Sequence, residues 1–179
     1  MGWKNFKEKF GIKHIIQINE KGLCIGSSYV HDIAVIDPTT GVIRENQTFS
    51  GFLKREYPAL LTASKQEILD VINSPDSFTA SIPVYTYNGG EIIEKQCEVL
   101  GWPNVTHDGC MMYENTFSED RNKVIVRAKR NIAYAIKNDL DCIKRVEKQL
   151  AELKSLLAID EADQAKLELE YPNIDTGDL

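Results

Sequence analysis

The sequence predicts an α+β fold, in which a small antiparallel sheet with one or two short helices is followed by a long C-terminal coiled-coil-like helix. Three observations predict it. Runs rich in Ile and Val, separated by turn residues, occupy much of residues 12–44. Ser64 and Glu67 form a capping box ahead of an apolar pattern with helical spacing. No glycine or proline lies between Ser118 and Pro172, where apolar residues recur every three or four positions.

Length and composition fit a globular protein made of one domain, or of one domain plus an extension. The chain has 179 residues, of which 42% are hydrophobic and 27% are charged. A net charge of −6 argues against nucleic acid as the main partner, because phosphate contacts usually require a basic surplus. No run of 18 apolar residues is present, so no membrane partner is expected. The N-terminal segment lacks the apolar length and the cleavage site of a signal peptide, which predicts a cytoplasmic location.

The first part of the chain predicts a short helix followed by strands. In residues 1–11, three aromatic side chains fall near one helical face, and Gly11 can end the helix. Ile- and Val-rich runs at 12–19 and 22–37, joined by a Glu-Lys-Gly turn, predict antiparallel strands. A second turn leads into a returning strand at 42–44, which completes a β-meander.

The middle of the chain predicts one helix and one strand. Residues 45–58 have no regular pattern, and a helix of roughly residues 59–73 follows them, ended by Asn-Ser-Pro. Residues 79–87 predict a strand, which Pro83 places at the edge of a sheet.

Residues 91–100 leave two alternatives open. The preceding Asn88-Gly89 is the usual signal of a two-residue hairpin turn, which would make the segment a strand. Its apolar residues, however, fall at helical spacing, and Gly101 followed by a proline is a good helix end, so a helix is favoured. Residues 105–117 then predict a strand that turns at Asp108-Gly109.

The last third of the chain predicts one long amphipathic helix. The expected organisation is an α+β head at 1–117, the helix at 118–171 with Ser118 as its N-cap, and a flexible tail at 172–179. Helical patterns of this length usually form coiled coils, and a helical hairpin with a break near Ile159 is the alternative. The apolar stripe predicted to carry oligomerisation consists of Ile132, Ile136, Leu140, Ile143, Val146, Leu150, Leu153 and Leu157.

Charge is distributed unevenly along this helix. From Arg121 to Lys148 there are nine basic and three acidic residues, and from Gln149 to Leu179 there are two basic and eight acidic residues. Opposite charge at the two ends favours antiparallel pairing of two copies, since a parallel pair would align like charges. A homo-oligomer is therefore predicted. The alternative is that both charged blocks only keep the helix solvated.

Candidate catalytic and metal-binding residues are few, and neither a catalytic residue nor a cofactor is predicted. The four cysteines contain no C-x-x-C pair, and with three histidines their spacings match no zinc finger or ribbon. The weak metal set is Cys97, His107 and Cys110, with Cys24 or His31 as a fourth ligand. The alternative to a non-enzymatic protein is a small metal- or ligand-binding enzyme that uses His31, His107, Asp108 and Cys110.

Nucleic acid gives a further alternative. The basic half of the helix, with Arg127 and Arg130, could contact phosphates, and the acidic end could mimic nucleic acid toward a basic partner. Neither half has the interleaved aromatic residues that stack on bases, so a nucleic-acid partner is not favoured.

One segment is more distinctive than the rest of the chain. Residues 101–131 read GWPNVTHDGCMMYENTFSEDRNKVIVRAKRN, and their characteristic features are Pro103, Thr106, Asp108-Gly109, Met112-Tyr113, Glu114-Asn115-Thr116, Ser118 and Asp120-Arg121, followed by an amphipathic helix. In these features the segment resembles small uncharacterised proteins of bacteriophages and prophages.

The resemblance implies a phage accessory factor, and it implies nothing about catalysis. Such a protein would act in the bacterial host cytoplasm by binding a host or phage protein, for example to inhibit a host defence. Together with the apolar stripe and the opposite charge blocks of residues 119–170, it predicts a non-enzymatic protein–protein interaction protein that self-associates through this helix. The candidate binding residues are His107, Asp108, Tyr113, Asn115, Arg127 and Arg130.

Overall fold

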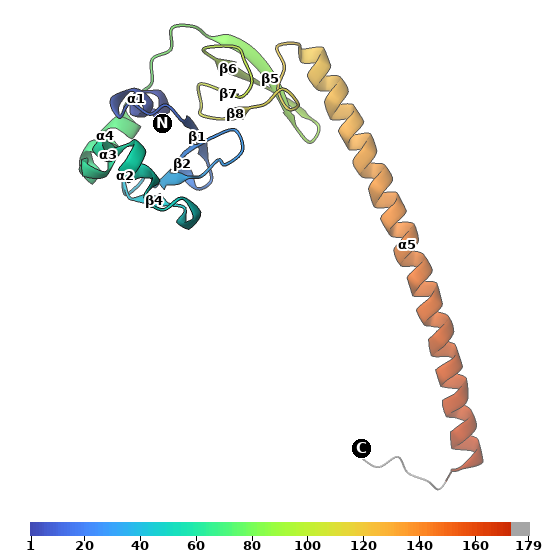
Figure 1. The fold of residues 1–179 in the computed structure, drawn as a ribbon. Helices are drawn as coiled ribbons and strands as arrows, with labels where there is room; N and C mark the ends of the chain where they lie inside the picture. The colour runs from blue at the N-terminus through green and yellow to red at the C-terminus, as the bar shows by residue number, and fades with distance from the viewer. Residues whose placement is uncertain (173–179) are drawn as a thin grey trace. The chain divides into compact units, whose positions relative to one another are not determined.

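The computed structural model describes residues 1–172 and has the α+β fold that the sequence predicts (Figure 1). Small antiparallel sheets and short helices precede a long C-terminal helix. The chain divides into two compact units, the first of which is Met1–Lys129 and includes the first turns of the long helix. None of the helices in the described residues combines the length and the apolar character that a membrane crossing requires.

The predicted β-meander is confirmed as a four-stranded antiparallel sheet. Its strands follow one another in the order β1-β2-β3-β4. Ile16 pairs with Ile25 across β1 and β2, and both side chains are fully buried, so the apolar residues that predict the strands also form the core. The strands are β1 (Ile15–Asn19), β2 (Gly22–Gly26), β3 (Ala34–Ile36) and β4 (Ile43–Glu45).

Short helices share one hydrophobic core with this sheet. Phe6 of the first helix, Leu53 and Ile72 are fully buried in the same cluster as the strand residues. The N-terminal helix is confirmed, and it ends just before Gly11 as predicted. The helical elements are α1 (Trp3–Lys9), the 3-10 helix η1 (Gln47–Phe49), α2 (Phe52–Glu56), α3 (Pro58–Thr62) and α4 (Lys65–Asn73).

Two predictions for residues 45–73 are wrong in detail. The segment 45–58 is not irregular throughout, because it contains η1 and α2. The helix predicted over 59–73 is divided into α3 and α4 at Ala63, whose backbone is extended. The division follows from the predicted cap, since the Ser64 hydroxyl accepts a hydrogen bond from the Glu67 N–H at 3.1 Å and so begins a new helix.

The next two strands form a hairpin, so the helix favoured for residues 91–100 is wrong and the alternative is right. β5 (Ile82–Asn88) confirms the strand predicted there, and β6 (Glu91–Cys97) pairs with it antiparallel along its whole length. Gly89 has a φ of 55°, which the tight turn requires and which glycine adopts without strain. Cross-strand pairing outweighs the helical spacing of the apolar residues.

Residues 105–117 do not form the long strand that was predicted. Two short strands, β7 (Asn104–Val105) and β8 (Met111–Met112), flank the Asp108-Gly109 turn, which is confirmed. These residues share a second, smaller core with the β5–β6 hairpin. It consists of Val84, Cys97, Met112 and Phe117.

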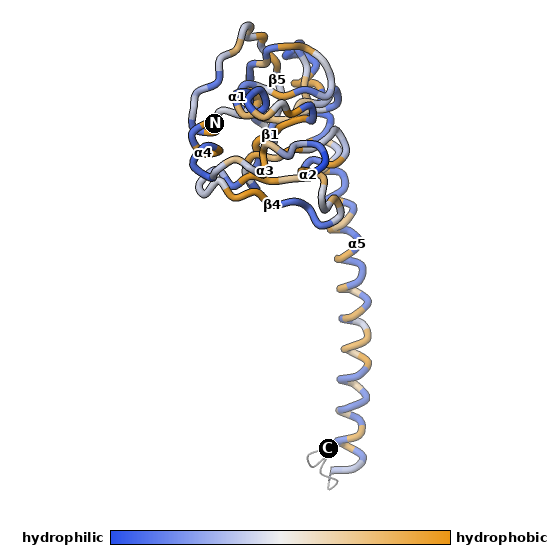
Figure 2. The backbone as a smooth tube through the Cα atoms, turned by 60° about the vertical axis from the view of Figure 1, so that its left-hand side comes forward, coloured by the Kyte–Doolittle hydropathy of each residue, from blue (hydrophilic) through white to orange (hydrophobic). Residues whose placement is uncertain are grey.

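The long helix, α5 (Arg121–Glu170), contains 50 residues and is continuous through Ile159, where a break was considered. The predicted N-cap, Ser118, is wrong. The N-cap is Asp120, whose carboxylate accepts hydrogen bonds from the N–H groups of Asn122 and Lys123. Ser118 instead pairs through its backbone with β5. Figure 2 shows hydrophobic and hydrophilic positions alternating along α5. The predicted tail, 172–179, lies outside the described residues except for Pro172.

Candidate functional site

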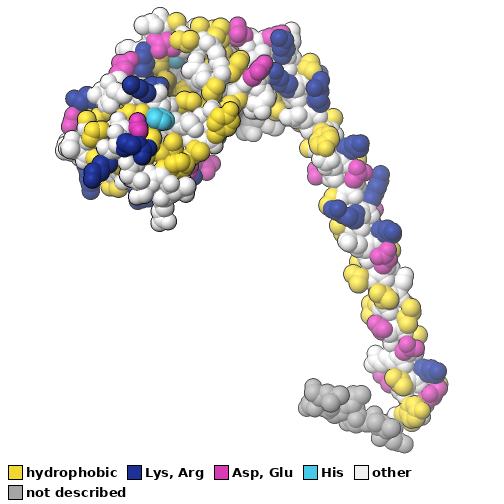
Figure 3. Space-filling model, in the orientation of Figure 1, with side chains coloured by type: hydrophobic (Ala, Val, Ile, Leu, Met, Phe, Trp, Pro, Cys, Tyr) yellow, Lys and Arg dark blue, Asp and Glu magenta, His cyan; other side chains and the backbone are white. Residues whose placement is uncertain are grey.

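The most extensive candidate site is the predicted apolar stripe of α5, which we call the seam. In the single chain its eight side chains are 39–64% exposed, and apolar side chains recur along α5 in the space-filling view (Figure 3). Their spacing of three or four residues places them along one side of the helix. An apolar stripe of this length is typical of a surface that is covered by another protein. The seam consists of Ile132, Ile136, Leu140, Ile143, Val146, Leu150, Leu153 and Leu157.

The charged residues of α5 have few partners within their own helix. Lys148 pairs with Glu152 at 3.8 Å and Lys166 with Glu170 at 4.0 Å, and all four side chains are exposed. Exposed pairs of this kind contribute little to stability. The opposite charges of the two halves of α5 therefore remain available to a second molecule.

His31 and Tyr113, which both belong to predicted sites, are brought together in the head. The Tyr113 hydroxyl donates to the carbonyl of Ser28 at 3.0 Å, and Nε2 of His31 lies 2.5 Å from the same hydroxyl. Because the hydroxyl has one proton, Nε2 of His31 is the donor in the second bond. Burial raises the pKa of Tyr113, so the phenol stays protonated. The hydrogen bond joins the loop that carries His31 to the segment that carries Tyr113.

His107 is placed for packing. Its ring stacks on Phe78, with 3.7 Å between ring centroids and planes within 6°. The backbone carbonyl of His107 accepts a hydrogen bond from the Trp3 indole at 3.0 Å. Its backbone N–H donates to the backbone carbonyl of Gln96 at 2.8 Å. Within the described residues its Nε2 is buried and has no hydrogen-bond partner. The contacts with Trp3 and Gln96 link α1 to β6, and the stacking on Phe78 covers one face of the imidazole.

Asp108 and Cys110 lie together at the turn between β7 and β8. The carboxylate of Asp108 accepts hydrogen bonds from the Thr106 hydroxyl and from Lys95. Burial opposes ionisation of this carboxyl, but the bonds from Lys95 and Thr106 outweigh it and lower its pKa. The pKa of the Cys110 thiol is raised, first by burial, so this cysteine is not an activated nucleophile.

Of the residues of the enzyme alternative, Asp108 and Cys110 lie together, and His31, His107 and Asp108 have separate side-chain partners. His31 contacts Tyr113, whereas His107 stacks on Phe78 and Asp108 pairs with Lys95. Cys97 is buried in the second core, and Cys24 is buried in β2. Across residues 1–172 no group of three or more His, Cys, Asp or Glu side chains could hold a metal ion, so the weak metal set does not assemble there.

The remaining predicted binding residues lie near the start of α5. Arg127 donates through Nη1 to the carbonyls of Glu114, at 2.7 Å, and Phe117, at 3.0 Å. Its guanidinium therefore anchors the turn that carries Asn115, which is exposed. Arg130 is also exposed. Of the two arginines that could contact phosphates, Arg127 is therefore already hydrogen-bonded to backbone carbonyls of the same chain.

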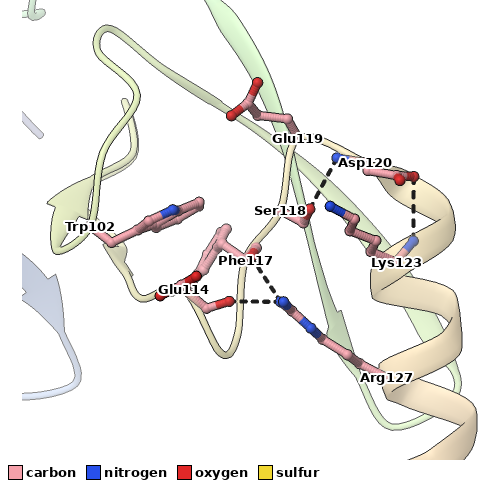
Figure 4. A pocket seen from close by; sticks show the side chains of 8 residues that line it. All are labelled: Trp102, Glu114, Phe117, Ser118, Glu119, Asp120, Lys123 and Arg127. Atoms are coloured by element: carbon pink, nitrogen blue, oxygen red, sulfur yellow. Dashed lines mark hydrogen bonds between the residues drawn. The ribbon is translucent and has the colours of Figure 1, made fainter.

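A pocket of about 320 Å³, which the sequence did not indicate, lies at the start of α5. Figure 4 shows the side chains that line it. Trp102 and Phe117 supply its apolar walls. Much of its charge is committed to the local fold, because Asp120 caps α5 and Arg127 binds carbonyls. The other lining residues are Glu114, Ser118, Glu119 and Lys123. The sequence signal for this pocket was a tryptophan, Trp102, between Gly101 and Pro103, and its side chain is partly exposed.

A second pocket of about 320 Å³ is bordered by His31, Tyr29 and the ion pair of Lys21 with Asp32. The hydrogen bond from Lys21 lowers the pKa of Asp32, and the same bond raises the pKa of Lys21. The two charges compensate each other, so this pocket has no net preference for an ionic ligand.

Comparison of the chain with protein-family models, with curated proteins and with solved structures gave no match. The resemblance of residues 101–131 to phage and prophage proteins therefore stays a prediction.

Proposed function

We propose that this protein is a non-enzymatic protein–protein interaction protein that self-associates through the seam of α5. The observation that carries the proposal is the exposure of eight apolar side chains along one side of a continuous helix of 50 residues. Covering such a stripe removes apolar area from water, which is the main favourable term in most protein association. A second copy presents a stripe of the same length and spacing.

Charge supports an antiparallel arrangement of the two copies. The half of α5 from Arg121 to Lys148 carries a surplus of basic residues, and acidic residues dominate from Gln149 onward. An antiparallel pair sets the basic half of each copy beside the acidic half of the other, whereas a parallel pair sets like charge beside like charge.

The biological setting rests on the resemblance of residues 101–131. With it, the proposed role is that of a phage accessory factor in the bacterial host cytoplasm. The self-associated protein would present its heads to a host or phage protein, for example a component of a host defence. The separate partners of His31, His107 and Asp108 support a binding role over catalysis.

Self-association is tested by measuring the mass of the full chain in solution by sedimentation equilibrium. We expect a dimer that dissociates on dilution, and a monomer for the double variant Leu150→Gln with Leu153→Gln. The matched control is Leu169→Gln with Tyr134→Gln, which removes two exposed side chains off the seam and leaves the dimer intact. A wild-type chain that stays monomeric at every concentration would contradict the proposal.

The phage setting has its own test. Bacteria that carry a defence system and express the wild-type protein should be plated with a phage sensitive to that system. We expect a higher plating efficiency with the wild-type protein than with the seam variant Leu150→Gln with Leu153→Gln. Equal plating for wild type, seam variant and empty vector, across a panel of defences, would remove defence inhibition from the proposal.

The nucleic-acid alternative has one observation in its favour. Four basic residues stand seven positions apart, and this spacing places them on one face of α5, turned away from the seam. Nucleic-acid binding by this face would weaken steeply as salt is raised. Retention of labelled duplex or single strands that does not depend on salt would exclude it. The four residues are Lys123, Arg130, Lys137 and Lys144.

A further inference from the structure

We propose that two copies of α5 pair antiparallel in one symmetric register, with Lys129 of each copy facing Asp160 of the other. This inference rests on the self-association proposed above and specifies the partner surface residue by residue. The centre of the pair lies between Lys144 and Arg145 of each copy.

The seam is nearly symmetric about this centre. Residues at equal distances before and after it face each other when two such helices run antiparallel. Three sets of apolar residues stand at equal distances, so each meets an apolar residue of the second copy. The facing residues are Ile132 with Leu157, Ile136 with Leu153, and Ile143 with Val146.

Lys129 and Asp160 extend the same symmetry with opposite charges. Lys129 lies three residues before Ile132, and Asp160 lies three residues after Leu157, so both continue the side of α5 that carries the seam. Both side chains are exposed, and neither has an ion-pair partner among the residues that the structure describes. Association would bury part of each charge, which is unfavourable without an opposite charge nearby. The symmetric register supplies that charge twice, once at each end.

Other arrangements of the same seam leave charges without partners. A parallel pair in register sets Lys129, Asp139 and Asp160 each against its own copy, so three pairs of like charge meet. An antiparallel pair shifted by seven residues one way sets Lys129 against Leu153, and shifted the other way it sets Asp160 against Ile136. The symmetric register leaves fewer charges on the seam without an opposite charge. In it, Asp139 faces Leu150, and the apolar Leu140 lies beside Asp139.

The first test uses the native Cys142, which is exposed, together with the variant Gln149→Cys. These two positions directly precede seam residues, and in the symmetric register they lie on the same flank of the pair about two residues apart along the axis. Mild oxidation of the full chain should give a covalent dimer in which peptide mapping finds Cys142 joined to the cysteine at 149. The double variant Gln149→Cys with Cys142→Ser should lose this crosslink.

A parallel pair is tested by Leu150→Cys in a Cys142→Ser background. Position 150 faces position 139 in the symmetric register, so the cysteines at 150 of the two copies should stay apart and no crosslink between them should form. In a parallel pair they would face each other and crosslink efficiently.

The second test exchanges the charges. Lys129→Asp and Asp160→Lys should each raise the dissociation constant of the dimer at least about tenfold, because each places two pairs of like charge across the seam. The variant with both exchanges should return to within about threefold of wild type, since opposite charges face each other again. Lys137→Asp changes the net charge equally on the face turned away from the seam, and should have a smaller effect than either exchange.

The outcomes separate this inference from the function on which it rests. A crosslink between positions 142 and 149 with rescue by the double exchange supports the register. A dimer that crosslinks at 150 or shows no rescue overturns the register and leaves self-association standing. A strict monomer overturns both, and circular dichroism of each variant checks that α5 still forms.

Discussion

The four-stranded sheet and α5 contain the same kinds of apolar residue in different surroundings. Ile16 and Ile25 are fully buried within the first compact unit, whereas Ile136 and Ile143 are 54% and 52% exposed on α5. The sheet buries its isoleucines against helices of its own chain. The sheet residues are therefore covered within their own unit, whereas the seam residues on α5 stay largely exposed in the single chain.

The largest expected effect comes from truncating one isoleucine in each region. Ile25→Ala should lower the free energy of unfolding of the head by about 3 kcal/mol, because it opens a cavity in a packed core. Ile143→Ala should change it by less than about 0.5 kcal/mol and should weaken self-association instead. Urea unfolding followed by tryptophan fluorescence reports on the head, where Trp3 is buried. Equal losses for the two variants at low protein concentration would break the comparison.

Arg127 and Arg130 sharpen the comparison at the boundary between the two units. Arg127→Ala removes two hydrogen bonds to the carbonyls of Glu114 and Phe117, and should destabilise the head by about 1–2 kcal/mol. Arg130→Ala, three residues further along α5, removes an exposed side chain and should leave head stability unchanged. The same urea unfolding measures both. A loss for Arg130→Ala as large as that for Arg127→Ala would place the boundary further along the helix.

The start of α5 gives a smaller effect. Asp120→Ala should cost about 1 kcal/mol, because it leaves the N–H groups of Asn122 and Lys123 without their side-chain acceptor. Ser118→Ala should cost less, since its hydroxyl accepts only from Asp120. Hydrogen exchange at the amides of Asn122 and Lys123 measures the cap directly. Faster exchange in Ser118→Ala than in Asp120→Ala would restore Ser118 as the N-cap.

The parts of the fold that could be predicted are those with a pattern repeated over many residues. The β-meander of residues 12–44 contains several Ile- and Val-rich runs separated by turn residues, and the seam of α5 repeats one helical period several times, so a single exception obscures neither pattern. β6 was missed because its apolar residues also fall at helical spacing, and the pairing with β5 that decides the matter is not visible in the segment itself. The N-cap of α5 lies two residues after the predicted one, because Ser118 and Asp120 are both good capping residues.

The candidate site in the head was less predictable, because it depends on contacts between distant positions. Tyr113 and His31 are 82 residues apart in sequence and share a hydrogen bond. In the nucleic-acid alternative Arg127 was a candidate for phosphate contacts, but its guanidinium is directed at carbonyls that only the folded turn brings near. The type of a residue indicates which hydrogen bonds its side chain can form. The fold determines which donor or acceptor lies close enough to form them.

The smallest expected effect comes from comparing one glutamate of the head with one glutamate of α5. Glu98 of the head accepts hydrogen bonds from Lys4 at 2.7 Å and from the N–H and hydroxyl of Thr79, and these bonds lower its pKa from about 4.5 to about 2. On α5, the carboxylate of Glu152 has one ion-pair contact among residues 1–172, to Lys148 at 3.8 Å.

A carboxyl whose pKa is lower in the folded state stabilises the fold above its unfolded pKa and loses that contribution as the pH falls through its folded value. Head stability should therefore decline between about pH 4.5 and pH 2, and Glu98→Gln should remove part of this decline. Glu152→Gln, the matched change on α5, should leave it intact. Thermal unfolding across this pH range measures the difference, and identical acid profiles for Glu98→Gln and wild type would show that the Lys4 and Thr79 contacts do not form in solution.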